Sequence, residues 1–294
     1  MFDGFATHRV RTSGAEIFLR SGGAGPPLLL LHGYPQTHAI WHRVAPALAE
    51  RFTVVCADLR GYGDSGKPEA GPDHAGYSKR AMAQDMVEAM AALGHDRFAV
   101  AGHDRGGRVT HRLCLDHPDR VRRAAVLDIV PTLTLFRATD QAFAYGYYHW
   151  FFLSQPAPLP ERLIGADPMF YLHAKLGQWS AAKNTSWLAP AALAEYERCF
   201  SNPATIRASC DDYRAAATID LVHDEADFAH RIACPLLVLW GERALMHRSF
   251  DVLATWREKA SGSVEGGPLP CGHYLPEEQP EATTAALARF FASS

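Results

Sequence analysis

The sequence predicts an α/β protein in which a mostly parallel, doubly wound sheet is interrupted by a helical insertion. Short apolar runs, which suit buried parallel strands, alternate with segments of helical spacing up to about residue 130. No convincing strand follows between Pro131 and Phe228, where aromatic-rich helical stretches are broken by prolines, and the strand pattern resumes at Pro235. We therefore expect a cap over the carboxyl edge of the sheet, with the chain divided into core 1–130, cap 131–228 and core 229–294.

Length and composition place the chain among ordinary globular proteins. Its 294 residues can hold one large domain or a core with an insertion, and 48% of them are hydrophobic. The formal net charge of −3 gives no sign of nucleic-acid binding or of attraction to a membrane surface. We find no signal-peptide pattern and no apolar stretch long enough to span a bilayer. Six scattered cysteines without a Cys-x-x-Cys pair favour reduced thiols and a cytoplasmic location.

The elements before the insertion are predicted from apolar runs, helical spacing and turn residues. Alternation on both sides of Ser13-Gly14 predicts a hairpin of residues 8–12 and 16–20. Ser78 suits an N-cap and Gly94 a stop for the helix between them. The short basic stretch 119–123 is interpreted as a solvated connection. The remaining elements, in chain order, are strand 27–31, helix 40–48, strand 52–56, strand 98–101, helix 109–115 and strand 124–129.

After the insertion, the sequence predicts a second, shorter part of the sheet. A continuous apolar run over 235–241 indicates a buried strand, and 264–269 indicates an irregular one. Helical spacing predicts helices over about 250–259 and 280–291.

The segment Gly102-His103-Asp104-Arg105-Gly106-Gly107 lies between a predicted strand and a predicted helix. Its pattern, Gly-x-nucleophile-x-Gly, is that of a sharp elbow that lifts one side chain to the rim of the sheet. Glycine is required because the strained turn leaves little room for neighbouring side chains. Asp104 occupies the nucleophile position, and a carboxylate attacks an alkyl carbon without first losing a proton, forming an ester. The alternative is an Asp that only caps the following helix.

An ester on Asp104 must be hydrolysed, which requires a base that activates water. His273 is the best candidate because it follows the last predicted strand and precedes the terminal helix. The base needs an acidic partner that fixes its tautomer. We favour Asp128, at the end of an apolar strand where an unpaired carboxylate is costly, and keep Glu242 as the alternative.

Two loops and one helical segment are candidates for other chemistry. The segment 32–36 follows a strand and suits an oxyanion loop, in which the backbone N–H groups of Tyr34 and Arg105 stabilise the developing charge. The glycine-rich segment 61–66 lacks the Lys-Ser/Thr placement of a phosphate loop. His38 and His42 have metal-ligand spacing but no third ligand. We therefore predict neither a metal nor a cofactor.

Two arginines, Arg105 and Arg108, follow the nucleophile by one and four residues. The second is expected to share a face of the helix with Asp104. A guanidinium fork binds a carboxylate well, so this pair indicates an anionic substrate. The alternative is that both arginines only neutralise Asp104.

These motifs together resemble the Asp-nucleophile branch of the α/β-hydrolase family, and within it the chain is similar to the fluoroacetate dehalogenases. The segments 32–38 and 61–65 indicate only the wider family. The arginine-containing elbow, combined with a His-Trp pair and a Tyr in the cap, is far more specific. The resemblance covers essentially the whole chain and rests on Phe5, segments 32–38 and 61–65, Asp104-Arg105-Gly106-Gly107-Arg108, Asp128, His149-Trp150, Tyr213 and His273.

The resemblance implies a mechanism for the cleavage of a carbon–halogen bond. Asp104 displaces halide from the α-carbon of a haloacetate whose carboxylate is held by Arg105 and Arg108. His273, oriented by Asp128, then activates water and releases glycolate. The leaving halide accepts hydrogen bonds from three cap residues that each offer an N–H or O–H donor, His149, Trp150 and Tyr213. Without the resemblance, the aromatic surroundings of His149-Trp150 favour simple packing.

The leading hypothesis is therefore a dehalogenase of short 2-haloacids that acts as a homodimer, the latter implied by the resemblance alone. Arg105 stands where haloalkane dehalogenases have Trp, which disfavours neutral haloalkanes. An epoxide hydrolase is the first alternative, because Tyr147 and Tyr148 leave room for the paired cap tyrosines of those enzymes. A non-catalytic ligand receptor on the same fold is the second. No nucleic acid or membrane partner is expected.

Overall fold

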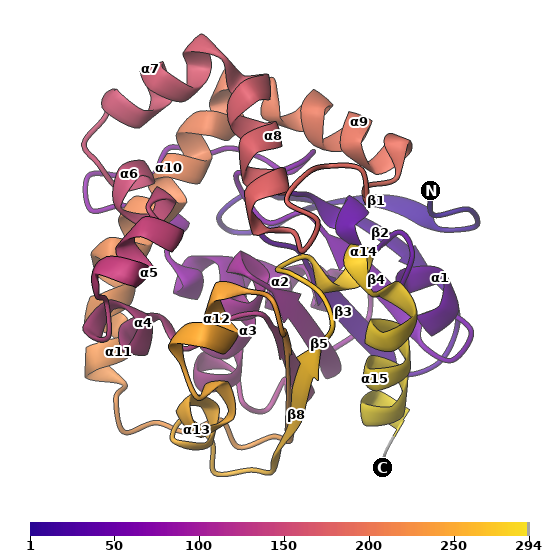
Figure 1. Ribbon diagram of the computed structural model, residues 1–294. Coiled ribbons are helices and arrows are strands. Elements are labelled where there is room, and N and C mark those ends of the chain that lie inside the picture. Colours follow the sequence, from indigo (N-terminus) through magenta and orange to yellow (C-terminus); the bar gives the residue numbers. More distant parts are fainter. Residues whose placement is uncertain (293–294) are drawn as a thin grey trace.

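The computed structural model describes residues 1–292, whose strands form one sheet (Figure 1). The spatial order of its eight strands in this part of the chain is β1-β2-β4-β3-β5-β6-β7-β8. The first hairpin pairs antiparallel, β2 pairs antiparallel with β4, and all other neighbours are parallel. The strands are β1 Ala6–Arg11, β2 Glu16–Gly22, β3 Pro27–Leu31, β4 Thr53–Ala57, β5 Phe98–His103, β6 Val121–Leu127, β7 Leu236–Gly241 and β8 Val264–Leu269.

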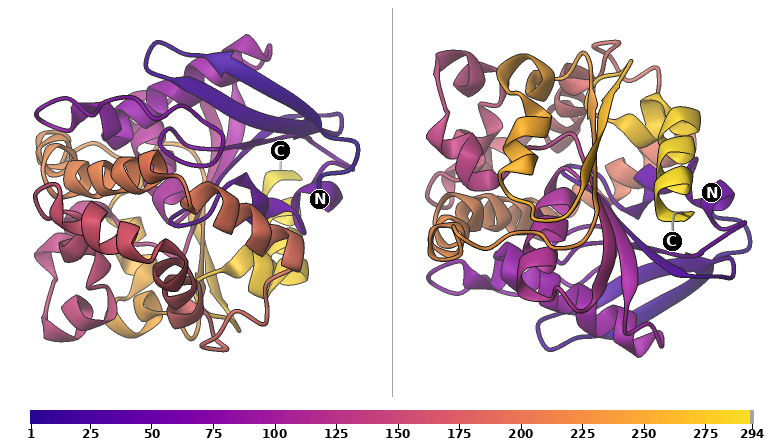
Figure 2. Two further views of the ribbon diagram at one scale, coloured as in Figure 1. Left: turned by 90° about the horizontal axis from the view of Figure 1, so that it is seen from above. Right: turned by 90° about the horizontal axis from the view of Figure 1, so that it is seen from below.

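Helices lie on both faces of the sheet and above one of its edges (Figures 1 and 2). The helices of the core are η1 His38–Trp41, α1 Ala45–Leu48, η2 Ala75–Tyr77, α2 Lys79–Ala92, α3 Arg105–Asp116, α12 Leu245–Ser249, α13 Val252–Arg257, α14 Leu275–Glu278 and α15 Pro280–Ala292. Between β6 and β7 the chain forms α4 Thr132–Arg137, α5 Gln141–Gly146, α6 His149–Leu153, α7 Leu159–Ala166, α8 Pro168–Trp179, α9 Pro190–Phe200, α10 Pro203–Ala217 and α11 Ile219–Ala226.

The parallel strands β3 to β7 bury both of their faces, because alternate side chains enter two separate hydrophobic clusters, whereas β8 at the edge has no buried residue. In β3, Leu29 joins the cluster that contains Met82 of α2 and Val109 of α3. The next residue back, Leu28, joins the cluster that contains Leu287 of α15. This arrangement is the doubly wound sheet that the sequence predicts, and the fold class is confirmed.

The segment between β6 and β7 packs on the core as well as on itself. Phe143, Trp150, Phe200 and Tyr213 all belong to the same hydrophobic cluster as the inner face of the sheet. In Figure 1 the helices from α6 to α10 lie over the carboxyl ends of the parallel strands. Side chains of this helical segment, named the cap here for its place above the strand ends, therefore come close to those that follow β5, β6 and β8.

Several predicted elements are confirmed almost residue by residue. The hairpin, the strand 27–31 and the strand 264–269 are present. Ser78 caps α2 by accepting a hydrogen bond from the Ala81 amide, and Gly94 has a φ of 84° just after the helix. All six cysteines of the described part are free. No helix in residues 1–292 is long and apolar enough to cross a membrane.

Four predicted segments were wrong in their limits. The helix 40–48 is two short helices, η1 and α1, because Pro46 begins a new helix and has no N–H to continue the old one. The basic stretch 119–123 is only partly a connection, since β6 already begins at Val121. The strand predicted as 124–129 ends at Leu127, because Asp128 takes a φ of 54°. The helix 250–259 is α13 alone, whose N-cap is Asp251, with α12 before it.

Candidate active site

Asp104 sits in a strained turn between β5 and α3. Its backbone has a φ of 47° and a ψ of −112°, and its side chain makes no capping hydrogen bond to the helix. A Cβ atom at Gly102 would lie 2.2 Å from the carbonyl oxygen of Gly106. Only glycine allows so close an approach, which explains this part of the motif. The interpretation of Asp104 as a simple helix cap is therefore wrong.

The loop after β3 holds one oxygen of the Asp104 carboxylate. The backbone N–H of Tyr34 donates a hydrogen bond of 2.9 Å to Oδ1. A Cβ atom at Gly33 would lie 2.4 Å from Cβ of Asp104, so this loop can approach only without a side chain there. The other oxygen of Asp104, Oδ2, does not take part in this hydrogen bond. It lies 3.9 Å from Nε2 of His273.

His273 and Asp128 form a close polar pair beside Asp104. Nδ1 of His273 lies 2.5 Å from Oδ2 of Asp128, whose other oxygen accepts a hydrogen bond of 2.9 Å from the Gly241 amide. Both side chains are buried. The bond directs Nε2 of His273 toward Asp104, the orientation that a general base requires. Glu242, the alternative partner, is exposed to solvent and makes no such contact within the described residues.

The electrostatics of the site favour an ionised Asp104 and a basic His273. Burial raises the pKa of Asp104, but the positive charges of His273, Arg105 and Arg108 bring this pKa below its usual value. Burial lowers the pKa of His273, but the hydrogen bond to Asp128 and the charge of that carboxylate raise it above its usual value. The Asp104 carboxylate is thus held in its ionised form, and Asp128 makes the imidazole of His273 a stronger base.

Arg105 is fully buried, and most of its guanidinium is held by Asp212 of α10. Nε and Nη2 donate to the two carboxylate oxygens at 2.8 and 2.6 Å, and Nη2 also reaches the Asp212 carbonyl oxygen at 3.0 Å. The aromatic rings of Trp150 and Tyr213 lie 5.0 and 4.2 Å from the guanidinium carbon. Nη1 has no hydrogen-bond partner within residues 1–292. Only the Nη1 amino group of Arg105, with its two N–H bonds, therefore remains for a ligand.

Arg108 is also buried, and like Arg105 it lies over the ring of Trp150. Its guanidinium carbon is 4.4 Å from the centroid of Trp150, and Nη1 donates to Val130 O and Thr132 Oγ1 at 3.1 and 3.0 Å. Nε has no partner in the described part of the chain. Burial and the neighbouring Arg105 lower the pKa of Arg108 to about 10. No carboxylate pairs with Arg108 in residues 1–292, so the site retains a positive charge that an anion can neutralise.

Three cap side chains place unused donors beside this pair of arginines. His149 and Trp150 begin α6, and Tyr213 lies in α10. The ring of Tyr213 is 5.4 Å from that of His149 and 5.3 Å from that of Trp150. His149 Nδ1, Trp150 Nε1 and the Tyr213 hydroxyl are all buried without a hydrogen-bond partner among the described residues. Buried donors are rarely left unpaired, so three together indicate space for a ligand with acceptor character.

Two charged residues of this region were not predicted from the sequence. Asp212 anchors Arg105, and it also binds the ammonium of Lys79 and accepts a hydrogen bond of 2.6 Å from Tyr62. Asp212 lies directly before Tyr213, which was predicted to belong to the site. A buried guanidinium without a carboxylate partner is costly, so an acidic residue next to a predicted site residue is the signal that could have found Asp212.

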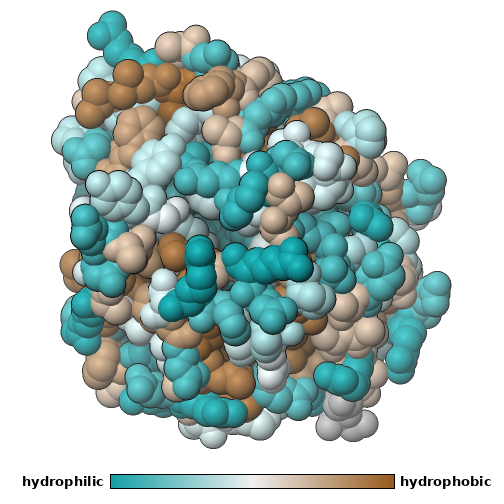
Figure 3. Space-filling view, in the orientation of Figure 1, coloured by the Kyte–Doolittle hydropathy of each residue, from teal (hydrophilic) through white to brown (hydrophobic). Residues whose placement is uncertain are grey.

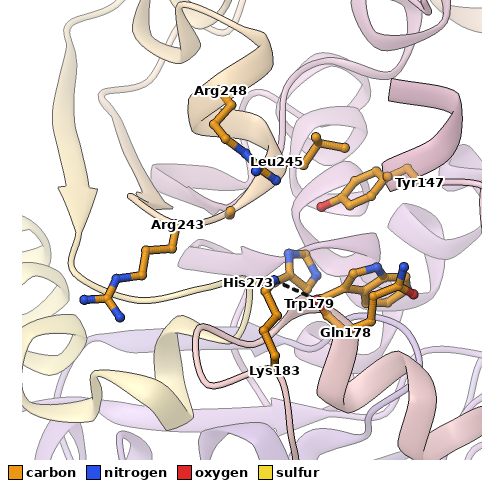
Figure 4. Close-up of a pocket in the computed structure, with 10 residues that line it drawn as sticks. Tyr147, Gln178, Trp179, Lys183, Arg243, Leu245, Arg248 and His273 are labelled. Carbon is orange, nitrogen blue, oxygen red and sulfur yellow. Dashed lines mark hydrogen bonds between the residues drawn. The ribbon is translucent and has the colours of Figure 1, made fainter. Parts of the chain in front are cut away.

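A pocket of about 420 Å³ leads to His273 (Figure 4). The hydrophobic part of its lining includes Tyr147, Trp179 and Leu245. Its charged part consists of Lys183, Arg243 and Arg248, with no carboxylate in the lining. All three cations are exposed, and in Figure 4 Arg248 reaches from α12 toward the interior. The entrance thus has a positive charge of its own.

The comparison with protein families agrees with this fold and elbow. Residues 26–280 match the family model described as the alpha/beta hydrolase fold. The chain belongs to the alpha/beta hydrolase family.

The most informative relatives divide between two kinds of enzyme. The chain is 46% identical over 294 residues to a fluoroacetate dehalogenase from a Burkholderia species, covering 100% of this chain and 96% of that protein. It is 35% identical over 289 residues to a soluble epoxide hydrolase from Corynebacterium sp. (strain C12), covering 97% and 96%. Among solved structures, an alpha/beta hydrolase from Nostoc sp PCC 7120 superposes with a TM-score of 0.98 at 58% identity, and the match covers 100% of both chains.

Proposed function

We propose that this protein is a hydrolytic dehalogenase of short 2-haloacids, with fluoroacetate as its leading substrate. The observation that carries the proposal is the set of unused donors around Asp104. Nη1 of Arg105 and Nε of Arg108 are free to bind a carboxylate, and three further donors lie in the cap next to them. A haloacetate has a carboxylate and a halogen one carbon apart, so it needs both kinds of donor within one small space.

In the first step, Oδ2 of Asp104 attacks the α-carbon of the substrate. The new C–O bond forms as the carbon–halogen bond breaks, and the halide leaves with the electron pair. Oδ1 becomes the carbonyl oxygen of the ester and keeps its hydrogen bond to the Tyr34 amide. The leaving halide accepts hydrogen bonds from His149, Trp150 and Tyr213, which compensate for the poor leaving ability of fluoride.

In the second step, His273 removes a proton from water, which attacks the ester carbonyl carbon of Asp104. Asp128 stabilises the imidazolium that forms. The N–H of Tyr34, with that of Arg105, stabilises the oxyanion of the tetrahedral intermediate. The bond between Cγ of Asp104 and the glycolate oxygen then breaks, and glycolate takes up the proton from His273. The Asp104 carboxyl group loses its remaining proton to solvent, which restores the carboxylate.

Epoxide hydrolysis is the second candidate, since Tyr147 lies at the entrance beside His273. Its hydroxyl would have to protonate an epoxide oxygen together with Tyr213. A release assay with fluoroacetate, chloroacetate and styrene oxide distinguishes the two activities. We expect halide release from the haloacetates that Asp104→Asn abolishes. Turnover of the epoxide without any halide release would overturn the proposal, and no turnover of any substrate would favour a non-catalytic receptor.

We propose further that residues 131–228 act as a cap over the core formed by 1–130 and 229–294, and that the protein forms a homodimer. Exposed apolar side chains of the cap, which contribute to the brown area at the top of Figure 3, support self-association. Leu159, Leu163 and Phe170 are 50%, 58% and 72% exposed. Light scattering during size exclusion is expected to give twice the monomer mass. The cytoplasmic location remains a prediction from the cysteine pattern.

A further inference from the structure

Lys175 of α8 is a buried cation for which the catalytic scheme has no use. Its side chain is 0% exposed, and no carboxylate pairs with it in residues 1–292. The ammonium nitrogen donates a hydrogen bond of 2.9 Å to Gln178 Oε1. Its remaining neighbours are aromatic, with the centroids of Tyr148, Trp179 and Tyr171 at 3.8, 5.2 and 5.6 Å. A buried charge without a counter-ion costs free energy of folding, so a buried and unpaired lysine suggests a functional role.

The aromatic ring of Trp179 separates Lys175 from the cap donors. The centroid of Trp179 lies 4.3 Å from that of His149, which in turn lies 5.4 Å from that of Tyr213. Burial lowers the pKa of His149 well below its usual value, and the positive charge of Lys175 lowers it further. Burial also lowers the pKa of Lys175 to about 7, and an anion that forms nearby favours its charged form. Lys175 and the cap donors thus share one dry region, in which charges act over longer distances than in water.

We propose that Lys175 is a positioning residue for the leaving group, whose unpaired charge holds a positive potential behind His149, Trp150 and Tyr213. The inference rests on the proposed dehalogenase function and deepens it. The donors form hydrogen bonds with the departing halide, whereas Lys175 stabilises the full negative charge that develops on it. A carboxylate next to Lys175 would cancel this potential, and none is present in the described residues.

The size of the effect follows from Coulomb's law. The two ring distances place the ammonium within about 10 Å of the centre of the His149 ring. At an effective dielectric constant of about 20, one charge at that distance changes the rate of forming an anion by roughly tenfold. Fluoride is the poorest leaving group of the halides, so its transition state comes later and places more of the negative charge on the halogen. It should therefore depend on Lys175 more than chloride does.

The experiment measures halide release in a single turnover, with wild-type or Lys175→Met enzyme in excess over fluoroacetate or chloroacetate. We expect the variant to release fluoride about tenfold more slowly and chloride no more than about threefold more slowly. Lys175→Arg keeps the charge and is expected to restore the wild-type ratio of the two rates. Lys259→Met is the matched control, because Lys259 also lies 3.8 Å from an aromatic centroid, that of Phe228, but away from the site.

Each outcome decides between Lys175 as a source of charge and Lys175 as a packing residue. Equal slowing of both halides in Lys175→Met, accompanied by a lower melting temperature, would overturn the inference. Lys175→Gln, which keeps a polar end, takes the same test if Lys175→Met does not fold. Absence of halide release from the wild-type protein would instead contradict the proposed function itself.

Discussion

The carboxylate of Asp212 accepts hydrogen bonds from Nε and Nη2 of Arg105, at 2.8 and 2.6 Å, and both side chains are fully buried. The pair joins the elbow of the core to helix α10 of the cap, two parts of the chain that are 107 residues apart. It leaves the Nη1 amino group, with its two N–H bonds, for a ligand. Asp212 therefore determines which part of Arg105 a substrate can reach.

We predict that Asp212→Asn weakens substrate binding more than it slows the chemical step. Without the carboxylate, Arg105 and Lys79 are left as buried charges with less compensation, and the guanidinium is free to turn. We expect KM for a haloacetate to rise about tenfold or more and the melting temperature to fall. Steady-state kinetics and thermal unfolding check this prediction. An unchanged KM with a lower kcat would show that Asp212 does not act through Arg105.

His273→Ala is expected to stop the reaction after the first step. Ester formation needs only the Asp104 carboxylate, whereas hydrolysis needs the base, so an alkylated enzyme should accumulate. Intact-protein mass spectrometry after incubation with a haloacetate would detect it, and peptide mapping would place the adduct on Asp104. Asp104→Asn is the control that should remain unmodified. An unmodified His273→Ala protein after long incubation would count against a covalent intermediate.

The two steps should differ in their dependence on pH. Only neutral His273 accepts a proton, and its pKa is raised, so hydrolysis should slow about tenfold per unit as the pH falls below that value. The pKa of Asp104 is lowered, so alkylation should continue to a lower pH. Rapid-quench measurements of halide release and of ester decay resolve the two steps. Loss of both at the same pH would contradict these assignments.

Salt should weaken the binding of anionic substrates through the charged entrance. Interactions between exposed charges are screened over about 10 Å at 0.1 M ionic strength, and Arg248 is exposed at the pocket. We expect KM for a haloacetate to rise about two- to threefold between low and high salt, and to do so less in Arg248→Gln. Arg51→Gln, an exposed position outside the pocket, is the control. An equal salt effect in Arg248→Gln and the wild type would exclude this role.

The fold and the grouping of Asp104, Asp128 and His273 could be predicted from the sequence, because both depend on local sequence signals. Apolar runs predict the parallel strands, and the ends of parallel strands meet at one edge of the sheet. Residues in the loops that follow β5, β6 and β8 are therefore close to one another, whatever the arrangement of the cap. Gly102 of the elbow is similarly local, since its Cβ atom would clash with the carbonyl oxygen of Gly106, whereas a Cβ atom at Gly106 would clash with that of His32 on a neighbouring loop.

The cap and the finer details of the site could not be predicted in this way. Its helices have no repeating strand pattern to fix their order in space, so the approach of Asp212 to Arg105 could not be predicted. The binding of a substrate carboxylate by the whole Arg105 guanidinium could not be judged from the sequence for the same reason. Asp212 already occupies part of that guanidinium. Limits of short helices also depended on single residues, such as Pro46 at the start of α1.

The central claim is that Asp104 itself displaces the halide, and one isotope experiment tests it most directly. The enzyme, in excess over fluoroacetate, is allowed a single turnover in water enriched in ¹⁸O. Because water attacks the ester carbonyl carbon, the label should appear in the carboxylate of Asp104, and the first glycolate should be unlabelled. Label found only in glycolate would mean that water attacks the substrate carbon directly, which would contradict nucleophilic displacement by Asp104.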